Sequence, residues 1–186
     1  MKSIGNIIKS DLYRYNALCG ITGFLNGFVL NPGFRYTYFF RKASKYKRYS
    51  FLGIYYRLLL YHYSYKYGFQ IPAGTKIGYG FYLGHFGIVV INVRAKIGNN
   101  CNIGPNVIIG QTNRGIKKGT PQIGNMVWIG SGAVIVGGII IGNNVLIAPL
   151  SYVNIDVPDN SLVIGNSAKI IPKEDATDGY INFTIV

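Results

Sequence analysis

A histidine between two nearby glycines is the first feature of this chain whose residue types and spacing suggest chemistry. The 186 residues contain only two histidines, and His85 stands in the run Gly84-His85-Phe86-Gly87. A neutral imidazole can accept a proton from a hydroxyl at physiological pH, which few other side chains do unaided. The glycines leave room for a ligand beside the ring. His85 is therefore our candidate general base, whereas His62, in a tyrosine-rich helical stretch, is expected to be structural.

The segment around this histidine belongs to a six-residue repeat. An isoleucine, leucine or valine returns at every sixth position over more than eighty residues, usually followed by a small residue. The aliphatic positions are Ile71, Ile77, Leu83, Ile91, Ile97, Ile103, Ile109, Ile123, Ile129, Ile135, Ile141, Ile147 and Val153. A period of six fits neither a helix nor a single alternating strand. It predicts a mainly β fold, a left-handed parallel β-helix, and not a glycine-rich β-sandwich, whose strands would not keep one register.

Two interruptions of the repeat mark where function is expected. The spacing from Leu83 to Ile91 is eight, so the coil that carries the candidate base has two extra residues. The spacing from Ile109 to Ile123 is fourteen, which leaves residues 111–122 as a protruding loop rich in Gly, Lys, Arg and Asn. Long excursions from a rigid solenoid often carry function.

The first seventy residues differ from the repeat in composition. They hold eleven Lys or Arg against the single acid Asp11, hence ten of the thirteen net positive charges, and twelve of the sixteen tyrosines. We expect short helices here, one with Asn31 as cap and Pro32 in its first turn, and a second ending at Tyr65. The chain is accordingly divided into three parts: 1–70, a basic helical region; 71–172, the β-helix with its loop; and 173–186, a tail of uncertain order.

A basic cluster lies between the two expected helices. It consists of Arg41, Lys42, Lys45, Lys47 and Arg48, and aromatic residues border it. Two interpretations stay open. The cluster is either a solvated face whose aromatics pack on the β-helix, or a surface that contacts anionic lipid, because such lipid attracts Lys and Arg and tyrosines suit the headgroup zone. Nucleic acid is disfavoured, since no RNA-binding or helix-turn-helix motif accompanies the charge.

Cysteine content and apolar runs bear on location. Cys19 and Cys101 suggest no disulfide framework and favour a reducing compartment. The N-terminus lacks the order of a signal peptide, and the most apolar early stretch, 17–30, is shorter than the roughly 20 residues that span a bilayer. We expect a cytoplasmic protein, peripheral at the inner face of the cell membrane if the basic cluster contacts lipid.

Residues 68–172 resemble the serine acetyltransferase-like branch of the hexapeptide acyltransferases, including members found in capsule and exopolysaccharide gene sets. The matching features are Ile77-Gly78-Tyr79-Gly80, Leu83-Gly84-His85 with Val89-Val90-Ile91, the two unusual spacings, and Val163-Ile164-Gly165-Asn166-Ser167-Ala168-Lys169-Ile170. The resemblance implies acetyl-CoA as cosubstrate without a metal, a cofactor groove between subunits of a homotrimer, and His85 as general base.

The same resemblance assigns roles to further residues. Backbone N–H groups of Gly110 and Gln111 are candidate donors to the oxyanion or the thioester. Gln70 stands where the family has an aspartate that orients the histidine. The expected cofactor contacts are Ser131, Gly132 and Pro149 for the pantetheine arm, and Asn166 and Lys169 for the adenine and phosphate end.

Departures from the family pattern bear on the acceptor. The family has an aspartate where Gly84 stands and a Gly-Asp-Arg-His-Pro run where residues 117–121 read Lys-Lys-Gly-Thr-Pro. Without that guanidinium, L-serine is expected to be a poor acceptor. The expected function is therefore acetyl-CoA-dependent O-acetylation of a sugar, polysaccharide or lipid-linked glycan hydroxyl, contacted by Asn92, Thr120 and the loop. The alternatives are a serine O-acetyltransferase and a non-catalytic β-helical scaffold; a γ-type carbonic anhydrase is disfavoured because residues 71–186 hold one histidine.

Overall fold

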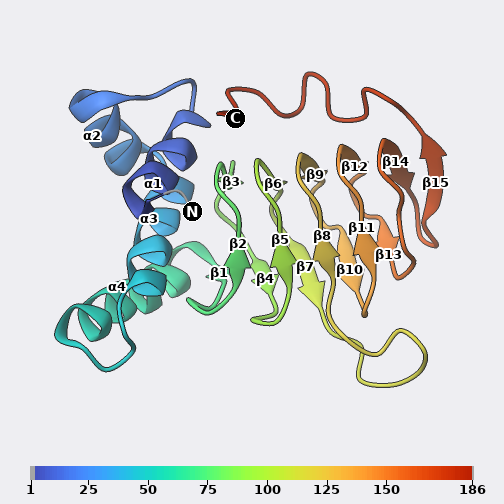
Figure 1. Cartoon of the computed structure of the whole chain (residues 1–186), viewed down its shortest axis with the longest axis horizontal. Coiled ribbons are helices and arrows are strands. Elements are labelled where there is room, and N and C mark those ends of the chain that lie inside the picture. The colour runs from blue at the N-terminus through green and yellow to red at the C-terminus, as the bar shows by residue number, and fades with distance from the viewer. Residues whose placement is uncertain (1–2, 186) are drawn as a thin grey trace.

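Helices cover one end of a parallel β-helix in the computed structural model, which describes residues 3–185 (Figure 1). The helices are α1 (Ile4–Tyr13), α2 (Gly20–Leu30), α3 (Pro32–Lys45) and α4 (Phe51–Tyr67). As predicted, Asn31 precedes α3 and Pro32 lies in its first turn. Helix α4 continues to Tyr67, where Gly68 ends it with a left-handed φ of 79°. Within residues 3–185 no helix combines the length and apolar content that crossing a membrane requires.

The strands form three sheets, which the chain visits in turn. Sheet A contains β1 (Phe69–Gln70), β4 (Val89–Ile91), β7 (Val107–Gly110), β10 (Val134–Val136) and β13 (Tyr152–Val153). Sheet B contains β2 (Lys76–Ile77), β5 (Lys96–Ile97), β8 (Gln122–Ile123) and β11 (Ile140–Ile141). Sheet C contains β3 (Tyr82–Leu83), β6 (Asn102–Ile103), β9 (Val127–Ile129), β12 (Val145–Ile147), β14 (Ser161–Ile164) and β15 (Lys169–Pro172). We name the three corners of the coil AB, BC and CA after the sheets that the chain leaves and enters.

The aliphatic residue of each repeat lies inside the coil. The parallel register pairs Ile91 with Ile109 and Ile109 with Ile135, and all three are at most 2% exposed. Full burial of such a side chain contributes about 1.5–3 kcal/mol. The glycines at the corners allow the coils to approach, since a Cβ on Gly124 would lie 2.6 Å from the carbonyl oxygen of Gly142. The predicted β-helix is confirmed.

A ladder of side chains joins successive coils at the BC corner. The Oδ1 atoms of Asn99, Asn125, Asn143 and Asp159 accept hydrogen bonds from the backbone N–H groups of Tyr79, Asn99, Asn125 and Asn143, at 2.7–3.1 Å. These bonds satisfy N–H groups of the turns that would otherwise lack partners. At the end of the ladder, bonds from the backbone and side chain of Asn143 lower the pKa of the Asp159 carboxyl.

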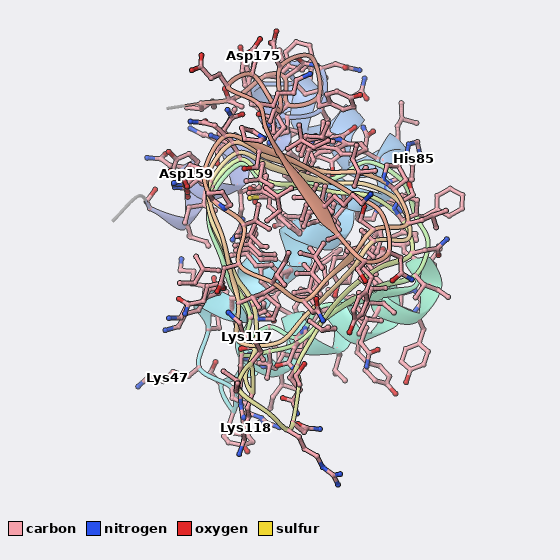
Figure 2. The ribbon with its side chains drawn as sticks, turned by 90° about the vertical axis from the view of Figure 1, so that its right-hand side faces the viewer. Lys47, His85, Lys117, Lys118, Asp159 and Asp175 are labelled. Atoms are coloured by element: carbon pink, nitrogen blue, oxygen red, sulfur yellow. The ribbon has the colours of Figure 1, made fainter. Side chains whose placement is uncertain are left out.

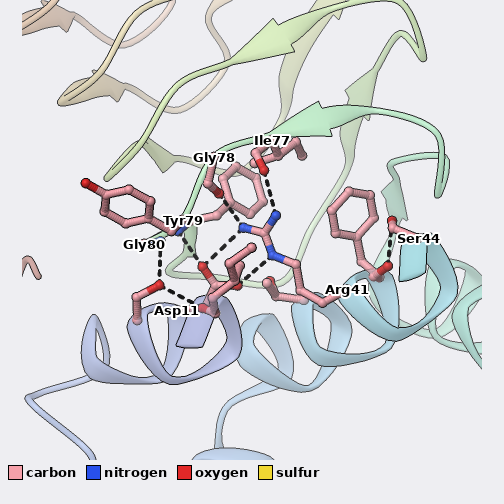
Figure 3. A network of polar contacts seen from close by, with 12 residues as sticks. Asp11, Arg41, Ser44, Ile77, Gly78, Tyr79 and Gly80 are labelled. Carbon is pink, nitrogen blue, oxygen red and sulfur yellow. Dashed lines mark hydrogen bonds and ion pairs between the residues drawn. The ribbon is translucent and has the colours of Figure 1, made fainter. Parts of the chain in front are cut away.

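A buried ion pair joins the helical cap, which consists of α1 to α4, to the first coil, which contains β1 to β3 (Figure 3). Asp11 of α1 and Arg41 of α3 lie 2.8 Å apart, and their side chains are 0% and 5% exposed. Arg41 also donates to the carbonyl oxygens of Ile77 and Gly78, and Asp11 accepts from the N–H of Phe81. Two helices therefore satisfy the backbone at the BC corner of the first coil.

This contact corrects part of the predicted basic cluster. The guanidinium of Arg41 is inside the protein, so it belongs neither to a solvated face nor to a lipid surface. The ammonium of Lys42 lies 5.4 Å from the ring centre of Tyr38, whereas Lys47 and Arg48 are exposed. The surface charge of this segment is therefore concentrated after residue 44.

The tail runs back along the β-helix toward the cap (Figure 1). Its contacts, from the last coil toward the first, are Lys173 with Asn160, Thr177 with Asn144, Tyr180 with Trp128 and Asn102, and Asn182 with Arg14. The sequence left the order of this segment open, and the structure shows it as a strap over successive coils.

Arg41→Met should lower the free energy of unfolding by about 3–5 kcal/mol, because the Asp11 carboxylate would stay buried without its partner. Urea unfolding followed by circular dichroism measures the change. Adding Asp11→Asn should recover part of the loss. As a control, Lys117→Met breaks the exposed pair with Asp156 and should cost less than about 1 kcal/mol. Equal losses at the two sites would contradict a special role for the buried pair.

Candidate active site

His85 lies in the turn between β3 and β4, at the CA corner of the first coil. Figure 2 looks along the coil and shows His85 at one corner, Asp159 at another, and Lys117 and Lys118 of the loop at the third. The His85 side chain is exposed, and exposed Phe86 and Ile88 flank it. An imidazole in this position is accessible to an acceptor hydroxyl and has apolar surface beside it.

Two buried tyrosines of the cap hold the backbone beside the two candidate catalytic residues. The hydroxyl of Tyr15 donates to the carbonyl oxygen of Leu83 at 3.1 Å and accepts from its N–H at 3.4 Å, in the strand before the candidate base. Tyr36 makes the same pair of bonds to Ile71, next to Gln70, at 3.0 and 3.2 Å. Strands β1 and β3 are the first of their sheets, so the hydroxyls satisfy backbone groups that have no neighbouring strand.

Gln70 lies on the outer face of sheet A, opposite Val90. It is exposed and lines a cavity of about 820 Å³ between α4 and the first coil. Among residues 3–185 the structure gives no hydrogen bond between Gln70 and His85. The orienting role expected for Gln70 therefore stays a prediction.

Four expected cofactor residues share the CA edge with His85. They are Ser131, Gly132, Pro149 and Asn166, in the turns after β9, β12 and β14. The turns stack directly, since the Gly132 N–H donates to the carbonyl oxygen of Pro105 at 2.9 Å. Four spacings between neighbouring strands separate the coil of His85 from that of Asn166, or about 19 Å. An extended phosphopantetheine arm suits an edge of this length.

The residues on this edge differ in how directly they indicate a ligand. A Cβ on Gly130 would lie 2.5 Å from the backbone nitrogen of Pro149, so the packing of the coils already requires a glycine there. Ser131, Pro149 and Asn166 are exposed and carry the cofactor prediction. Lys169, exposed in β15, adds positive charge at the far end, which suits a phosphate.

The other expected site residues gather at the AB corner. The Asn92 Nδ2 donates to Gln111 Oε1 at 3.3 Å, and the Gln111 Nε2 donates to Asn113 Oδ1 at 2.6 Å. Gly110 ends β7 beside them, and Thr120 lies half-buried where the loop returns to the coil. The structure thus brings the predicted residues together as two groups, on the two edges of sheet A.

The protruding loop is tied to the coil. Thr112 and Gly119 exchange backbone hydrogen bonds of 2.9 Å, and the carbonyl oxygen of Lys117 accepts from the Gly138 N–H at 2.8 Å. The Lys117 ammonium pairs with Asp156. The charge of Lys117 is therefore compensated by Asp156, while Lys118 is exposed.

The AB corner also holds an arginine that the sequence pattern did not single out. Arg94 is exposed, and its backbone N–H donates to Asn92 Oδ1 at 2.9 Å. The interrupted repeat pointed to the loop, whereas Arg94 belongs to the preceding coil. Within residues 3–185 no group of three or more His, Cys, Asp or Glu could hold a metal ion.

The repeat itself matches a known family. A profile described as bacterial transferase hexapeptide (six repeats) matches residues 120–154. With the buried six-residue repeat and the three-sided coil, this match makes the chain similar to the hexapeptide-repeat transferases over these residues.

Beyond the repeat, the chain is similar to serine acetyltransferases. It is 36% identical over 107 residues to the serine acetyltransferase of Helicobacter pylori (strain 26695), a match that covers 58% of this chain and 63% of that protein. It is 38% identical over 102 residues to the mitochondrial serine acetyltransferase 3 of Arabidopsis thaliana, covering 55% and 26%. The chain therefore matches less than two thirds of the length of these curated relatives.

Solved structures extend the similarity to the helical cap. The soybean serine acetyltransferase apoenzyme superposes with a TM-score of 0.77 at 28% identity, covering 91% of this chain and 69% of that one. The Neisseria gonorrhoeae serine acetyltransferase gives a TM-score of 0.75 at 28% identity, covering 92% and 67%.

These relatives overturn the expected acceptor. The proteins similar to this chain are named serine acetyltransferases, so the expectation of a sugar, polysaccharide or lipid-linked glycan, and of a role in polysaccharide biosynthesis, is wrong. L-serine was expected to be a poor acceptor because residues 117–121 contain no arginine to bind its carboxylate. Arg94 lies at the same corner, in the turn between β4 and β5.

Tyr15→Phe should lower kcat for acetyl transfer by about tenfold or more, because the strand before His85 loses its anchor. The KM for acetyl-CoA should change less than about twofold, since the rest of the CA edge is untouched. Steady-state kinetics separate the two effects. Ile139→Val, which costs about 0.5–1.5 kcal/mol in a later coil, is the control and should leave kcat unchanged. A similar fall in both variants would point to general loosening.

Proposed function

We propose that this protein transfers the acetyl group of acetyl-CoA to the hydroxyl of L-serine, with His85 as general base. The observation that carries the proposal is the exposed His85 at one end of an edge that continues through Ser131, Pro149 and Asn166. The similarity to serine acetyltransferases supports the choice of acceptor.

In the proposed reaction, His85 removes the proton of the serine hydroxyl as the oxygen attacks the thioester carbonyl carbon. Backbone N–H groups of Gly110 and Gln111 donate to the oxyanion that forms. The carbon–sulfur bond then breaks, and the imidazolium returns the proton to the leaving thiolate. Arg94 binds the serine carboxylate, since a guanidinium can contact both oxygens, and Asn92 adds a hydrogen bond.

We further propose that the protein is a homotrimer, because a site that uses both corners needs two chains. Within one chain His85 and the loop lie at different corners (Figure 2). Threefold packing of three-sided coils places the CA corner of one subunit beside the AB corner of the next. The cofactor then lies between subunits, with Lys169 near its phosphates.

His85→Ala should lower kcat by about 100-fold or more with little change in the KM for acetyl-CoA. Release of the CoA thiol in the presence of L-serine measures the rate. Arg94→Gln should instead raise the KM for L-serine by about tenfold, because the bidentate carboxylate contact is lost. Thr120→Ala should do much less than either. A wild-type protein that releases no more thiol with L-serine than without it would contradict the proposal.

Mixing two impaired variants, His85→Ala and Arg94→Ala, tests the trimer. If each site combines His85 of one subunit with Arg94 of the next, random co-assembly of His85→Ala and Arg94→Ala chains restores about one site in four. Activity of the mixture at subsaturating L-serine should then approach about a quarter of the wild-type rate. A mixture no more active than the sum of its parts, or a monomer in light scattering, would exclude the shared site.

A further inference from the structure

Helix α4 carries apolar residues on two opposite sides, and only one side packs against the protein. Leu60 and Tyr67 belong to the core cluster shared with α3 and the first coil. On the other side, spacings of four, three and four residues place four apolar or aromatic side chains in one line. This line, which we name the α4 stripe, consists of Ile54, Leu58, Tyr61 and Tyr65. Its residues are 48–74% exposed, so a whole apolar face of the helix lacks a partner among residues 3–185.

Two arginines stand between two apolar hollows beside the stripe. Arg48, Arg57 and Tyr61 line both hollows, one of about 820 Å³ and the other of about 410 Å³. The larger hollow continues along the first coil past Phe69, and the smaller one includes the stripe residues Ile54 and Leu58. An elongated apolar ligand fits along such hollows, and an anionic group at its end would reach the guanidinium groups.

The positive charge here has no counterpart in the surrounding sequence. No Asp or Glu occurs between Asp11 and Asp156, and the Asp11 carboxylate is already paired with Arg41 in the interior. The Arg57 guanidinium donates to the backbone carbonyl oxygens of Tyr46 and Gly53, which leaves its charge uncompensated. In Figure 2, the Lys47 side chain projects away from the protein into solvent.

This charge decides what covers the stripe. A heptad-like spacing could also join two copies of α4, but such a contact would bring like charges together without an acid to separate them. An anionic lipid surface suits both the exposed apolar stripe and the positive charge beside it, since it takes up apolar and tyrosine side chains and attracts Lys and Arg. We propose that the α4 stripe, with Lys47, Arg48 and Arg57, docks the protein on an anionic membrane surface. In the proposed trimer with its axis along the coil, three stripes lie at one end, which strengthens binding.

Helix α2 provides an internal comparison. It exposes Ile21, Leu25 and Val29, which lie four residues apart on one face. Residues 15–34 contain no Lys or Arg, so charge favours no anionic partner for that face. The proposal is therefore confined to α4.

Vesicle flotation with the full chain tests the proposal. We expect the protein to float with vesicles of phosphatidylcholine containing phosphatidylglycerol and to stay unbound with phosphatidylcholine alone. Binding should weaken as salt rises from 0.1 M to 1 M, because the Debye length falls from about 10 Å to about 3 Å. Arg48→Gln with Arg57→Gln should weaken binding about 30-fold, at roughly fivefold for each cation.

Three matched variants complete the test. Lys76→Gln with Lys96→Gln removes the same charge from sheet B and should change binding by less than about twofold. Ile21→Ser with Leu25→Ser removes the same two side-chain types from exposed positions of α2 and should leave binding intact. Ile54→Ser with Leu58→Ser, both at exposed positions, should abolish flotation while keeping the circular dichroism spectrum.

Three results would overturn the proposal. They are a wild-type protein that ignores phosphatidylglycerol, an equal loss of binding in the sheet B or α2 variants, or a fall in mass by light scattering for the Ile54→Ser, Leu58→Ser protein. The last result would make the α4 stripe a contact between copies of the chain. The assay measures binding and not acetyl transfer, so its outcome is separate from that of the proposed activity.

Discussion

The buried pair of Asp11 and Arg41 closes the open end of the coil, and the rest of the structure depends on this closure. A β-helix exposes unpaired backbone groups and its apolar interior at its first turn. Burial raises the pKa of the Asp11 carboxyl, and the charge of Arg41 acts in the opposite direction. Once both helices are fixed there, the hydroxyls of Tyr15 and Tyr36 can reach the strands beside His85 and Gln70. The cap is thus both a lid on the core and a support for the candidate site.

Local sequence patterns predicted the coil well and the cap only in part. Every coil packs on the next in the same way, so each requires an aliphatic residue and a small neighbour at the same positions. This requirement repeats along the chain and can be recognised in a single sequence. Pro32 after Asn31 likewise marks a helix start through local geometry. The pairing of Asp11 with Arg41 joins two helices thirty residues apart, and no local rule encodes it. One signal in the sequence was not used: Asp11 is the single acid among eleven Lys and Arg residues in this segment.

The candidate site also contains residues whose placement follows from the repeat and residues whose placement does not. Ser131 and Pro149 are eighteen residues apart, one full coil, so their shared edge follows from the repeat. The two interruptions change the number of residues in a coil, so positions near them cannot be assigned to a corner by counting. For this reason the tertiary placement of Arg94 and of the loop was not predicted. Our error about the acceptor had this origin, because the expectation considered residues 117–121 alone and not Arg94, which lies at the same corner in the preceding coil.

The strap of residues 173–185 changes how the coil can lose its structure. In a simple solenoid each coil contacts only its neighbours, so the ends can fray separately and unfolding can proceed in pieces. Here Lys173 is bonded to the last coil and Asn182 to Arg14 of the cap, with contacts to the coils between. Opening either end must first detach this segment. The strap therefore converts a linear array into one cooperative unit, in which local opening approaches the cost of global unfolding.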